Sequence, residues 1–162
     1  RVGHHDKIHL FDVSVPESGE QYRESDSIVA GEQPLVVDSP FGKIGISVCY
    51  DLRFPEHYRQ MVAQGAEIFT IASAFTAATG QAHWETLVRA RAIENLSYVV
   101  APNQGGRHAS GRETYGDSMV VDPWGQVLNR VASGPGVAIG TIDTAKLQRT
   151  REHFPCLTHR RL

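Results

Sequence analysis

The sequence is poor in cysteine, in long apolar runs and in clustered charge. Only two of its 162 residues are cysteines, Cys49 and Cys156, which are too few for a disulfide framework and favour a reducing, cytoplasmic setting. No apolar run approaches the ~20 residues of a membrane span. The formal net charge is −2 and basic residues do not cluster, so nothing points to nucleic acid or an anionic membrane as a partner.

The chain also has no internal repeat, no low-complexity stretch and no linker rich in Gly, Pro and Ser, which excludes an array of small domains. Its length and 41% hydrophobic content fit one globular domain with a sizeable core. The chain starts at Arg1, and a strand-like segment follows within a few residues. We therefore expect it to be part of a longer protein.

The hydrophobic pattern predicts strands that alternate with helices, followed by hairpins. The run at 68–72 is apolar throughout, as in strands that are buried on both faces. Pro55 and Glu56 favour the first turn of a helix that ends near Gly65. We expect strands at 7–11, 35–37, 43–49, 68–72, 98–101, 118–121, 127–130 and 136–142, helices at 55–65, 83–95 and 144–152, and loops at 13–31 and 73–81. This order indicates an α/β fold with a mixed sheet.

Cys49 ends one of these strands and is the first candidate for a reactive residue. Because side chains alternate along a strand, it shares a face with the small residues Gly45 and Ser47, where a ligand can come close. The carboxyl end of a strand, just before a helix N-terminus, is where ligands gather and where a thiolate is favoured. The alternative is inert packing, since free cysteines are often buried. Cys156, in the irregular tail, has no such setting, and we interpret it as structural.

A nucleophilic cysteine needs a base and a group that holds the oxyanion. None of the eight histidines lies in a segment that marks it as the base of a papain-type pair. His5 and His9 have i,i+4 spacing but bracket a strand-like segment, so we expect no metal site there. A lysine and a glutamate are the more natural partners.

Several motifs, in order along almost the whole chain, resemble the nitrilase (carbon-nitrogen hydrolase) superfamily. Lys7 begins KIHLFD, Glu24 lies in RES, and Cys49 lies in GISVCYDLRFPE. The later motifs are SAF at 73–75, HWE at 83–85, RARAIEN at 89–95, YGDSMVVDPWG at 115–125 and HRR at 159–161. The number and order of these motifs make the resemblance specific.

The resemblance implies an α-β-β-α sandwich and an amidase with a Glu-Lys-Cys site that needs no cofactor or metal. Cys49 would attack an amide carbonyl or nitrile carbon and form an acyl-enzyme. Lys7 and the backbone N–H of Tyr50 would stabilise the oxyanion, and Glu24 would orient the lysine. Taken singly, Lys7 is better explained as an exposed edge-strand lysine and Glu24 as a solvated loop residue. Together with Cys49, in the family's order, both favour the catalytic interpretation.

One part of the family pattern is absent. The family's general-base glutamate precedes the lysine strand, and no residue of this chain fills its position. We therefore expect residues 1–162 to be the C-terminal portion of a single carbon-nitrogen hydrolase domain, and to be inactive alone.

Within the superfamily, the chain is most similar to the deaminated glutathione amidase branch, with the ω-amidases as near neighbours. Both act on small carboxylate amides, so we expect a cationic side chain near the thiol. Arg53 is the candidate, with an ion pair to Glu56 or Asp51 as the alternative. Residues at strand ends beside the nucleophile are candidate pocket walls: Tyr50, Phe75 and Thr76. Asp117 departs from the branch, in which many members have histidine.

Alternatives from the same family and from other classes stay open. A nitrile hydrolase would use the same nucleophile. A catalytically silent scaffold would have no need for Lys7 and Cys49, and a redox-sensing thiol would need a resolving partner such as Cys156. The resemblance also implies a homodimer or larger assembly through residues 54–64 and the C-terminal tail.

Overall fold

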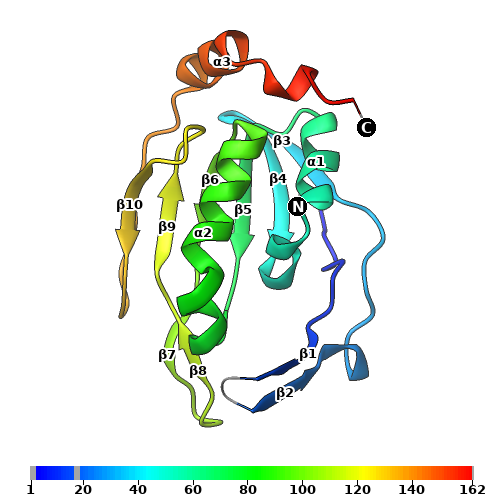
Figure 1. The fold of residues 1–162 in the computed structure, drawn as a ribbon, viewed down its shortest axis with the longest axis vertical. Coiled ribbons are helices and arrows are strands. Elements are labelled where there is room, and N and C mark those ends of the chain that lie inside the picture. The colour runs from blue at the N-terminus through cyan, green and yellow to red at the C-terminus, as the bar shows by residue number, and fades with distance from the viewer. Residues whose placement is uncertain (1–2, 17–18, 162) are drawn as a thin grey trace.

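The computed structural model describes residues 3–16 and 19–161, and a six-stranded mixed sheet forms its centre (Figure 1). The strands of this sheet are β3 (Leu35–Ser39), β4 (Gly42–Val48), β5 (Ile68–Ala72), β6 (Tyr98–Ala101), β9 (Ser118–Val121) and β10 (Val127–Val131). Their spatial order is β10-β9-β6-β5-β4-β3. The central strands β4, β5 and β6 run parallel, and the outer strands pair antiparallel. The α/β class predicted from the sequence is confirmed.

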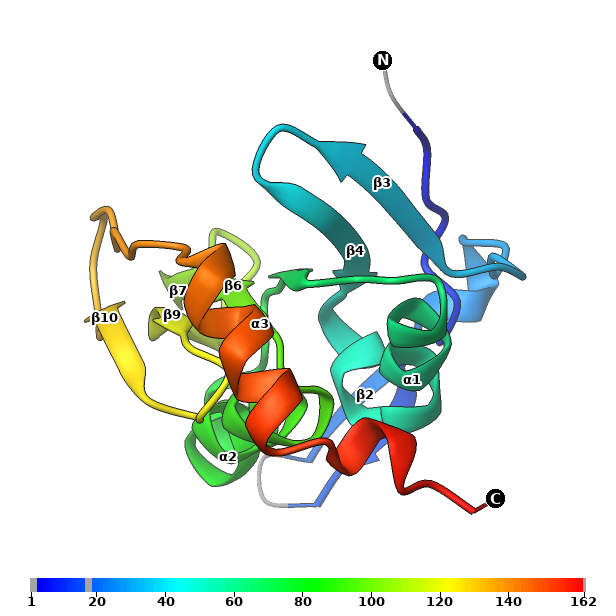
Figure 2. The same cartoon turned by 90° about the horizontal axis from the view of Figure 1, so that it is seen from above.

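Two helices, α1 (Pro55–Ala63) and α2 (Ala77–Asn95), cover one face of the sheet (Figures 1 and 2). Their apolar side chains, including Met61 and Trp84, meet those of the central strands in the main core. Gly45 of β4 allows this contact, because a Cβ there would lie 2.7 Å from Met61 Sδ. The face of β4 that carries small residues therefore packs against α1.

The opposite face of the sheet is less covered by the described residues. Ile44, Ile46 and Val48 alternate on it and are half-buried. At one end, Leu147 of α3 (Thr144–His153) packs against Ile68. Both α3 and the short 3₁₀ helix η3 (Cys156–Thr158) lie at the end of the sheet away from the carboxyl ends of β4 and β5 (Figure 1).

Two short hairpins lie near the carboxyl ends of the parallel strands (Figure 1). One joins β1 (Asp12–Val15) to β2 (Glu20–Arg23), and the other joins β7 (Gly105–Arg107) to β8 (Glu113–Tyr115). Two 3₁₀ helices, η1 (Glu24–Asp26) and η2 (Cys49–Arg53), continue directly from β2 and β4. These elements surround the sheet edge at which α/β proteins bind ligands.

Most of the predicted elements are confirmed within a few residues, but the predicted strand at 7–11 is wrong. In that segment the backbone N–H of His9 donates to Asp51, at 3.0 Å, and that of Phe11 donates to Glu24, at 2.7 Å. Side-chain carboxylates thus satisfy the backbone groups that a strand would pair with a neighbour. The segment is extended but belongs to no sheet.

Three further predictions need correction. The segment 136–142 forms no strand, and Val137 and Ile139 point into solvent with 79% and 74% of their surface exposed. The loop predicted at 13–31 contains the β1–β2 hairpin. The loop predicted at 73–81 contains the first turn of α2, which starts early because Thr76 Oγ1 accepts from the N–H of Thr79. No helix among the described residues is long and apolar enough to cross a membrane.

Candidate active site

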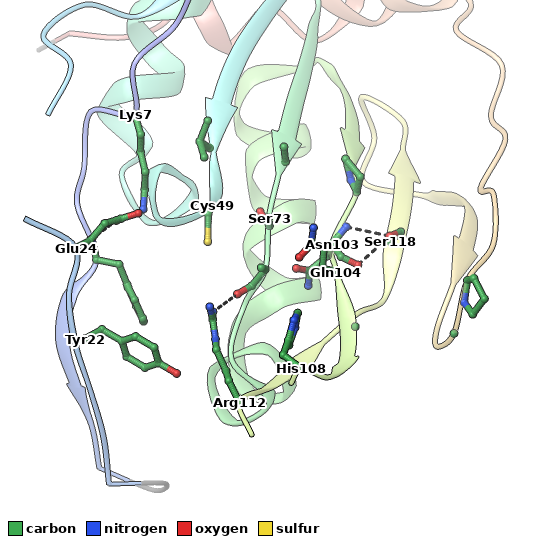
Figure 3. A pocket seen from close by; sticks show the side chains of 18 of the residues that line it. Lys7, Tyr22, Glu24, Cys49, Ser73, Asn103, Gln104, His108, Arg112 and Ser118 are labelled. Carbon is green, nitrogen blue, oxygen red and sulfur yellow. Dashed lines mark hydrogen bonds and ion pairs between the residues drawn. The ribbon is translucent and has the colours of Figure 1, made fainter. Parts of the chain in front are cut away.

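An open pocket of about 1060 Å³ lies at the carboxyl ends of β4 and β5 (Figure 3). Three residues singled out from the sequence, Lys7, Glu24 and Cys49, line it together. Figure 3 shows the Lys7 ammonium against the Glu24 carboxylate, with the Cys49 thiol pointing into the same space. The other labelled lining residues are Tyr22, Ser73, Asn103, Gln104, His108, Arg112 and Ser118. A pocket of this size can hold a small organic substrate.

Cys49 has an unusual backbone. It is the first residue after β4, and its φ of 50° lies in the left-handed region that side chains other than glycine rarely adopt. The carboxylate of Asp51 braces this turn, because its Oδ2 accepts from the N–H of Val48 at 2.9 Å. Such strained positions cluster at functional sites. The chain passes from β4 directly into η2, which begins at Cys49, and the helix predicted from Pro55 follows as α1.

Lys7 and Glu24 form an ion pair inside the pocket wall. Lys7 Nζ donates to Glu24 Oε2, and the side chains are only 10% and 24% exposed. The same carboxylate oxygen accepts from the backbone N–H of Phe11, so Glu24 binds both Lys7 and Phe11, the two ends of the segment 7–11. Glu24 thereby sets the direction of the Lys7 side chain, and a charge-assisted bond of this kind is among the stronger hydrogen bonds.

The remaining predicted residues lie around a second, much smaller cavity of about 20 Å³. Its lining includes Cys49 together with Tyr50, Arg53, Phe75 and Thr76. Both Phe75 and Thr76 are buried, at 4% and 1% exposure, and Thr76 caps α2. The structure thus places these residues beside the thiol but outside the large pocket, and a role for them in substrate binding stays a prediction.

Arg53 has different partners from those considered in the sequence. Its guanidinium lies over the rings of Tyr50 and Phe75, 5.8 and 5.4 Å from their centroids, and Nη1 is 3.3 Å from His83 Nδ1. Burial lowers the pKa of Arg53, and the nearby Tyr50 and Cys49 partly oppose this effect. Among the described residues it pairs with neither Glu56 nor Asp51. The positive charge of Arg53 is therefore stabilised by the two aromatic rings beside Cys49.

Arg112 is a pocket residue that the sequence reasoning missed. It follows β7 and lies over the ring of Tyr22, 5.3 Å from its centroid. Its Nη2 donates to the carbonyl of Ala74 at 2.6 Å, while its Nε is buried without a hydrogen-bond partner. No local pattern marks Arg112, because the β7–β8 hairpin brings it to the pocket from a distant part of the chain.

The pocket itself contains no metal cluster. Within residues 3–16 and 19–161, the group of His, Cys, Asp and Glu side chains with metal-ligand spacing is His5, Asp51 and His57. None of the three lines the pocket. The pocket brings together a thiol, an ammonium and a carboxylate, with the imidazole of His108 and the guanidinium of Arg112 also in its lining.

A comparison with protein families shows which family the chain belongs to. The family model described as carbon-nitrogen hydrolase matches residues 1–152. The chain belongs to the carbon-nitrogen hydrolase family. The superfamily predicted from the sequence motifs is therefore confirmed.

Two relatives of this carbon-nitrogen hydrolase carry the same name. The deaminated glutathione amidase of Synechocystis sp. (strain PCC 6803 / GT-S) is 47% identical over 156 residues, which are 95% of this chain and 57% of the relative. The deaminated glutathione amidase of Bos taurus is 51% identical over 158 residues, 96% of this chain and 47% of the relative. The chain spans about half the length of these curated relatives. The predicted similarity to this branch is confirmed.

The fold agrees with that of a solved structure. The C. elegans NitFhit protein superposes with a TM-score of 0.91 at 44% identity, over 99% of this chain and 39% of that one. The nitrilase-like fold predicted from the motifs is therefore confirmed.

Asp117, where the sequence departs from many members of the branch, has a structural role in this carbon-nitrogen hydrolase. It is 4% exposed, and its φ of 63° places it in the left-handed region. Its Oδ1 accepts from Arg130 Nε at 2.8 Å, and its carbonyl accepts from the indole of Trp84 at 2.7 Å. These bonds join α2 to β10, away from the pocket lining.

Proposed function

We propose that this protein hydrolyses the C–N bond of small carboxylate amides, with Cys49 as the nucleophile. The observation that carries the proposal is that Cys49 and the Lys7–Glu24 pair line one open pocket. The names of the two relatives favour a deaminated glutathione-like amide as substrate. The site would then be of the Glu-Lys-Cys type, with no cofactor or metal in the reaction.

The mechanism follows from the three side chains. The Cys49 thiolate attacks the amide carbonyl carbon, and the carbonyl π electrons move onto oxygen. The Lys7 ammonium and the backbone N–H of Tyr50 stabilise this oxyanion. When the intermediate collapses, the C–N bond breaks, the amine leaves with a proton, and a thioester remains on Sγ. Water then adds to the thioester, and collapse of the second intermediate releases the carboxylic acid and the thiolate.

A proton carrier is needed in both halves of this reaction. Glu24 already holds Lys7, so it is poorly placed to act as the general base. In the superfamily a glutamate serves this purpose, and we predict that the corresponding glutamate lies outside residues 1–162. We also predict that residues 1–162 are the C-terminal portion of one domain. On that view the 162-residue chain alone is inactive, and amide turnover by the purified chain would contradict it.

A carboxylate on the substrate needs a cation in the pocket. Arg112 lines both the large pocket and the small cavity, and its Nε is buried without a partner, whereas Arg53 lines only the small cavity of the two. We favour Arg112 as the carboxylate-binding residue, because a guanidinium with a free N–H can complete a bidentate pair. Arg53, Phe75 and Thr76 would then hold Cys49 in position from the side of the small cavity.

Other readings make different use of the same residues. An ω-amidase or a nitrile hydrolase would keep Cys49 and Lys7 and differ in the pocket walls. A silent scaffold leaves the partly buried Lys7–Glu24 pair beside a thiol unexplained. A redox pair with Cys156 is disfavoured, since η3 lies at the opposite end of the sheet (Figure 1). Assembly as a homodimer through residues 54–64 and the tail, and a cytoplasmic location, remain parts of the proposal.

The test is intact mass spectrometry of the protein at its full natural length, mixed briefly with deaminated glutathione. We expect an acyl adduct or turnover that disappears in Cys49→Ala and persists in Cys156→Ala. A panel of ω-amides and nitriles then ranks the substrates. If no member of the panel gives an adduct or turnover, the hydrolase proposal is wrong.

A further inference from the structure

Three side chains from three segments meet in the interior beside the pocket wall. His5 lies in the extended N-terminal segment, Asp51 in η2, and His57 in α1. Their side chains are 3%, 0% and 3% exposed. One potential ligand atom from each lies within 4.8 Å of those of the other two. We call these three residues the buried histidine cluster.

Three of the four ring nitrogens in this cluster have no hydrogen-bond partner. Neither Nδ1 nor Nε2 of His5 makes a hydrogen bond, and Nε2 of His57 makes none. His5 Nε2 lies 3.8 Å from Asp51 Oδ2, which is too long for a hydrogen bond. A buried polar atom without a partner costs about 1–3 kcal/mol. The cluster therefore has unused lone pairs that point to a missing ligand.

Asp51 is held in place from two sides. Its Oδ1 accepts from the backbone N–H of His9 at 3.0 Å and lies 2.8 Å from His9 Nδ1. Its Oδ2 accepts from the backbone N–H of Val48 at 2.9 Å. The carboxylate is therefore fixed beside His5 and His57.

His57 offers Nε2 to a ligand, because this buried nitrogen has no hydrogen-bond partner. Groups that bind a metal are usually oriented by outer hydrogen-bond partners. The contact of His9 with Asp51 Oδ1 orients the carboxylate in this way.

We propose that His5, Asp51 and His57 bind one Zn²⁺ ion. Two imidazole nitrogens and a carboxylate oxygen are a common zinc donor set, and hard ions such as Mg²⁺ prefer all-oxygen sites. Zinc bonds of about 2.0–2.2 Å at tetrahedral angles place donors about 3.3 Å apart, and the donor atoms now lie within 4.8 Å, so the side chains close by up to about 1.5 Å when the ion binds. A water molecule completes the four ligands.

This zinc ion has a structural role. It joins the N-terminal segment to η2 and α1, two residues from Lys7 in one segment and two residues from Cys49 in another. It thereby fixes the distance between the two groups of the proposed active site without touching the pocket. The binding residues all lie within this chain, so the proposal does not depend on the substrate.

The test is zinc binding by chelator-treated protein, measured by isothermal titration calorimetry and by metal content after desalting. We expect one Zn²⁺ per chain, and affinity at least about 100-fold weaker in both His5→Gln and His57→Gln. His4→Gln is the matched control, because His4 is adjacent to His5 but 59% exposed and paired with Asp6. Both His4→Gln and Cys49→Ser should bind zinc within about 2-fold of the parent.

A second measurement protects the test against variants that fail to fold. Free zinc at about 100 times Kd should raise the Tm of the parent protein by about 5–10 °C and leave the Tm of a folded His57→Gln unchanged. Absence of zinc binding in the parent protein would overturn the proposal. So would undiminished binding in both histidine variants, or loss of binding in Cys49→Ser.

Discussion

The same two segments of the chain contribute to two very different polar clusters. Lys7 and Cys49 face an open pocket, whereas His5 and Asp51, two residues away in each segment, face the interior. In the pocket, Lys7 and Glu24 pair with each other and remain partly exposed. In the buried histidine cluster, the side chains are almost fully covered, and three ring nitrogens have no partner.

The segment around Lys7 belongs to no sheet, and η2 turns the chain directly after β4, so neither segment keeps the strand rule that residues two apart share a face. One segment can therefore serve a substrate on one side and the scaffold on the other. The pocket residues should therefore control activity with little effect on stability. The cluster residues should control stability, and activity only through it.

The largest expected effect is that of Cys49→Ala on activity. Without the thiol no acyl-enzyme forms, so kcat should fall at least about 10⁴-fold, while the free energy of unfolding changes by less than about 1 kcal/mol. Steady-state kinetics on the full-length protein and urea unfolding measure the two. Cys156→Ala is the control and should keep full activity. Residual turnover above one per cent in Cys49→Ala would remove Cys49 from the mechanism.

Asp51→Ala should have the largest effect on stability. Asp51 is 0% exposed and accepts hydrogen bonds from the backbone N–H groups of Val48 and His9, so its removal leaves buried donors unpaired. We expect the free energy of unfolding to fall by about 3–5 kcal/mol in urea titrations.

The matched control for Asp51→Ala is Asp38→Ala, because the Asp38 side chain is 87% exposed and makes only a surface pair with Lys43. Its effect should stay below about 1 kcal/mol. Equal losses in the two variants would mean that the interior cluster adds nothing to stability, and the contrast between the clusters would fail.

Lys7→Met should have an intermediate effect, on kcat. The methionine keeps the length of the side chain but removes the charge that stabilises the oxyanion, so kcat should fall about 10²–10³-fold with little change in KM. Lys43→Met, at a 49% exposed position on β4, is the control. A rise in KM alone would show that Lys7 binds substrate and does not stabilise the transition state.

Much of the fold and part of the site could be predicted from the sequence. The apolar run at 68–72 and the helix start at Pro55 are local signals, and both are confirmed. The segment around Lys7 is extended as expected, yet it forms no strand, because the carboxylates of Asp51 and Glu24 take its N–H groups. Those partners are far apart in sequence, and no local pattern shows them.

The same limit applies to the site residues. Lys7, Glu24 and Cys49 were found through motifs and do line one pocket. His5 and His9 were set aside as metal ligands because they bracket a strand-like segment, and the third member of the cluster, His57, lies on a different element. Arg112 reaches the pocket through a hairpin. Contacts between distant segments decide these roles, and they appear only in three dimensions.

The smallest expected effect separates the two arginines near Cys49. Arg112→Lys keeps the charge but loses the planar fork, so we expect KM for a carboxylate amide to rise about 10-fold with kcat nearly unchanged. Arg53→Lys, on the side of the small cavity, should change KM by less than about 2-fold. An amide without a carboxylate should show neither effect. If Arg53→Lys raises KM instead, the substrate carboxylate lies on the side of Tyr50 and Phe75, and the large pocket holds the other end of the substrate.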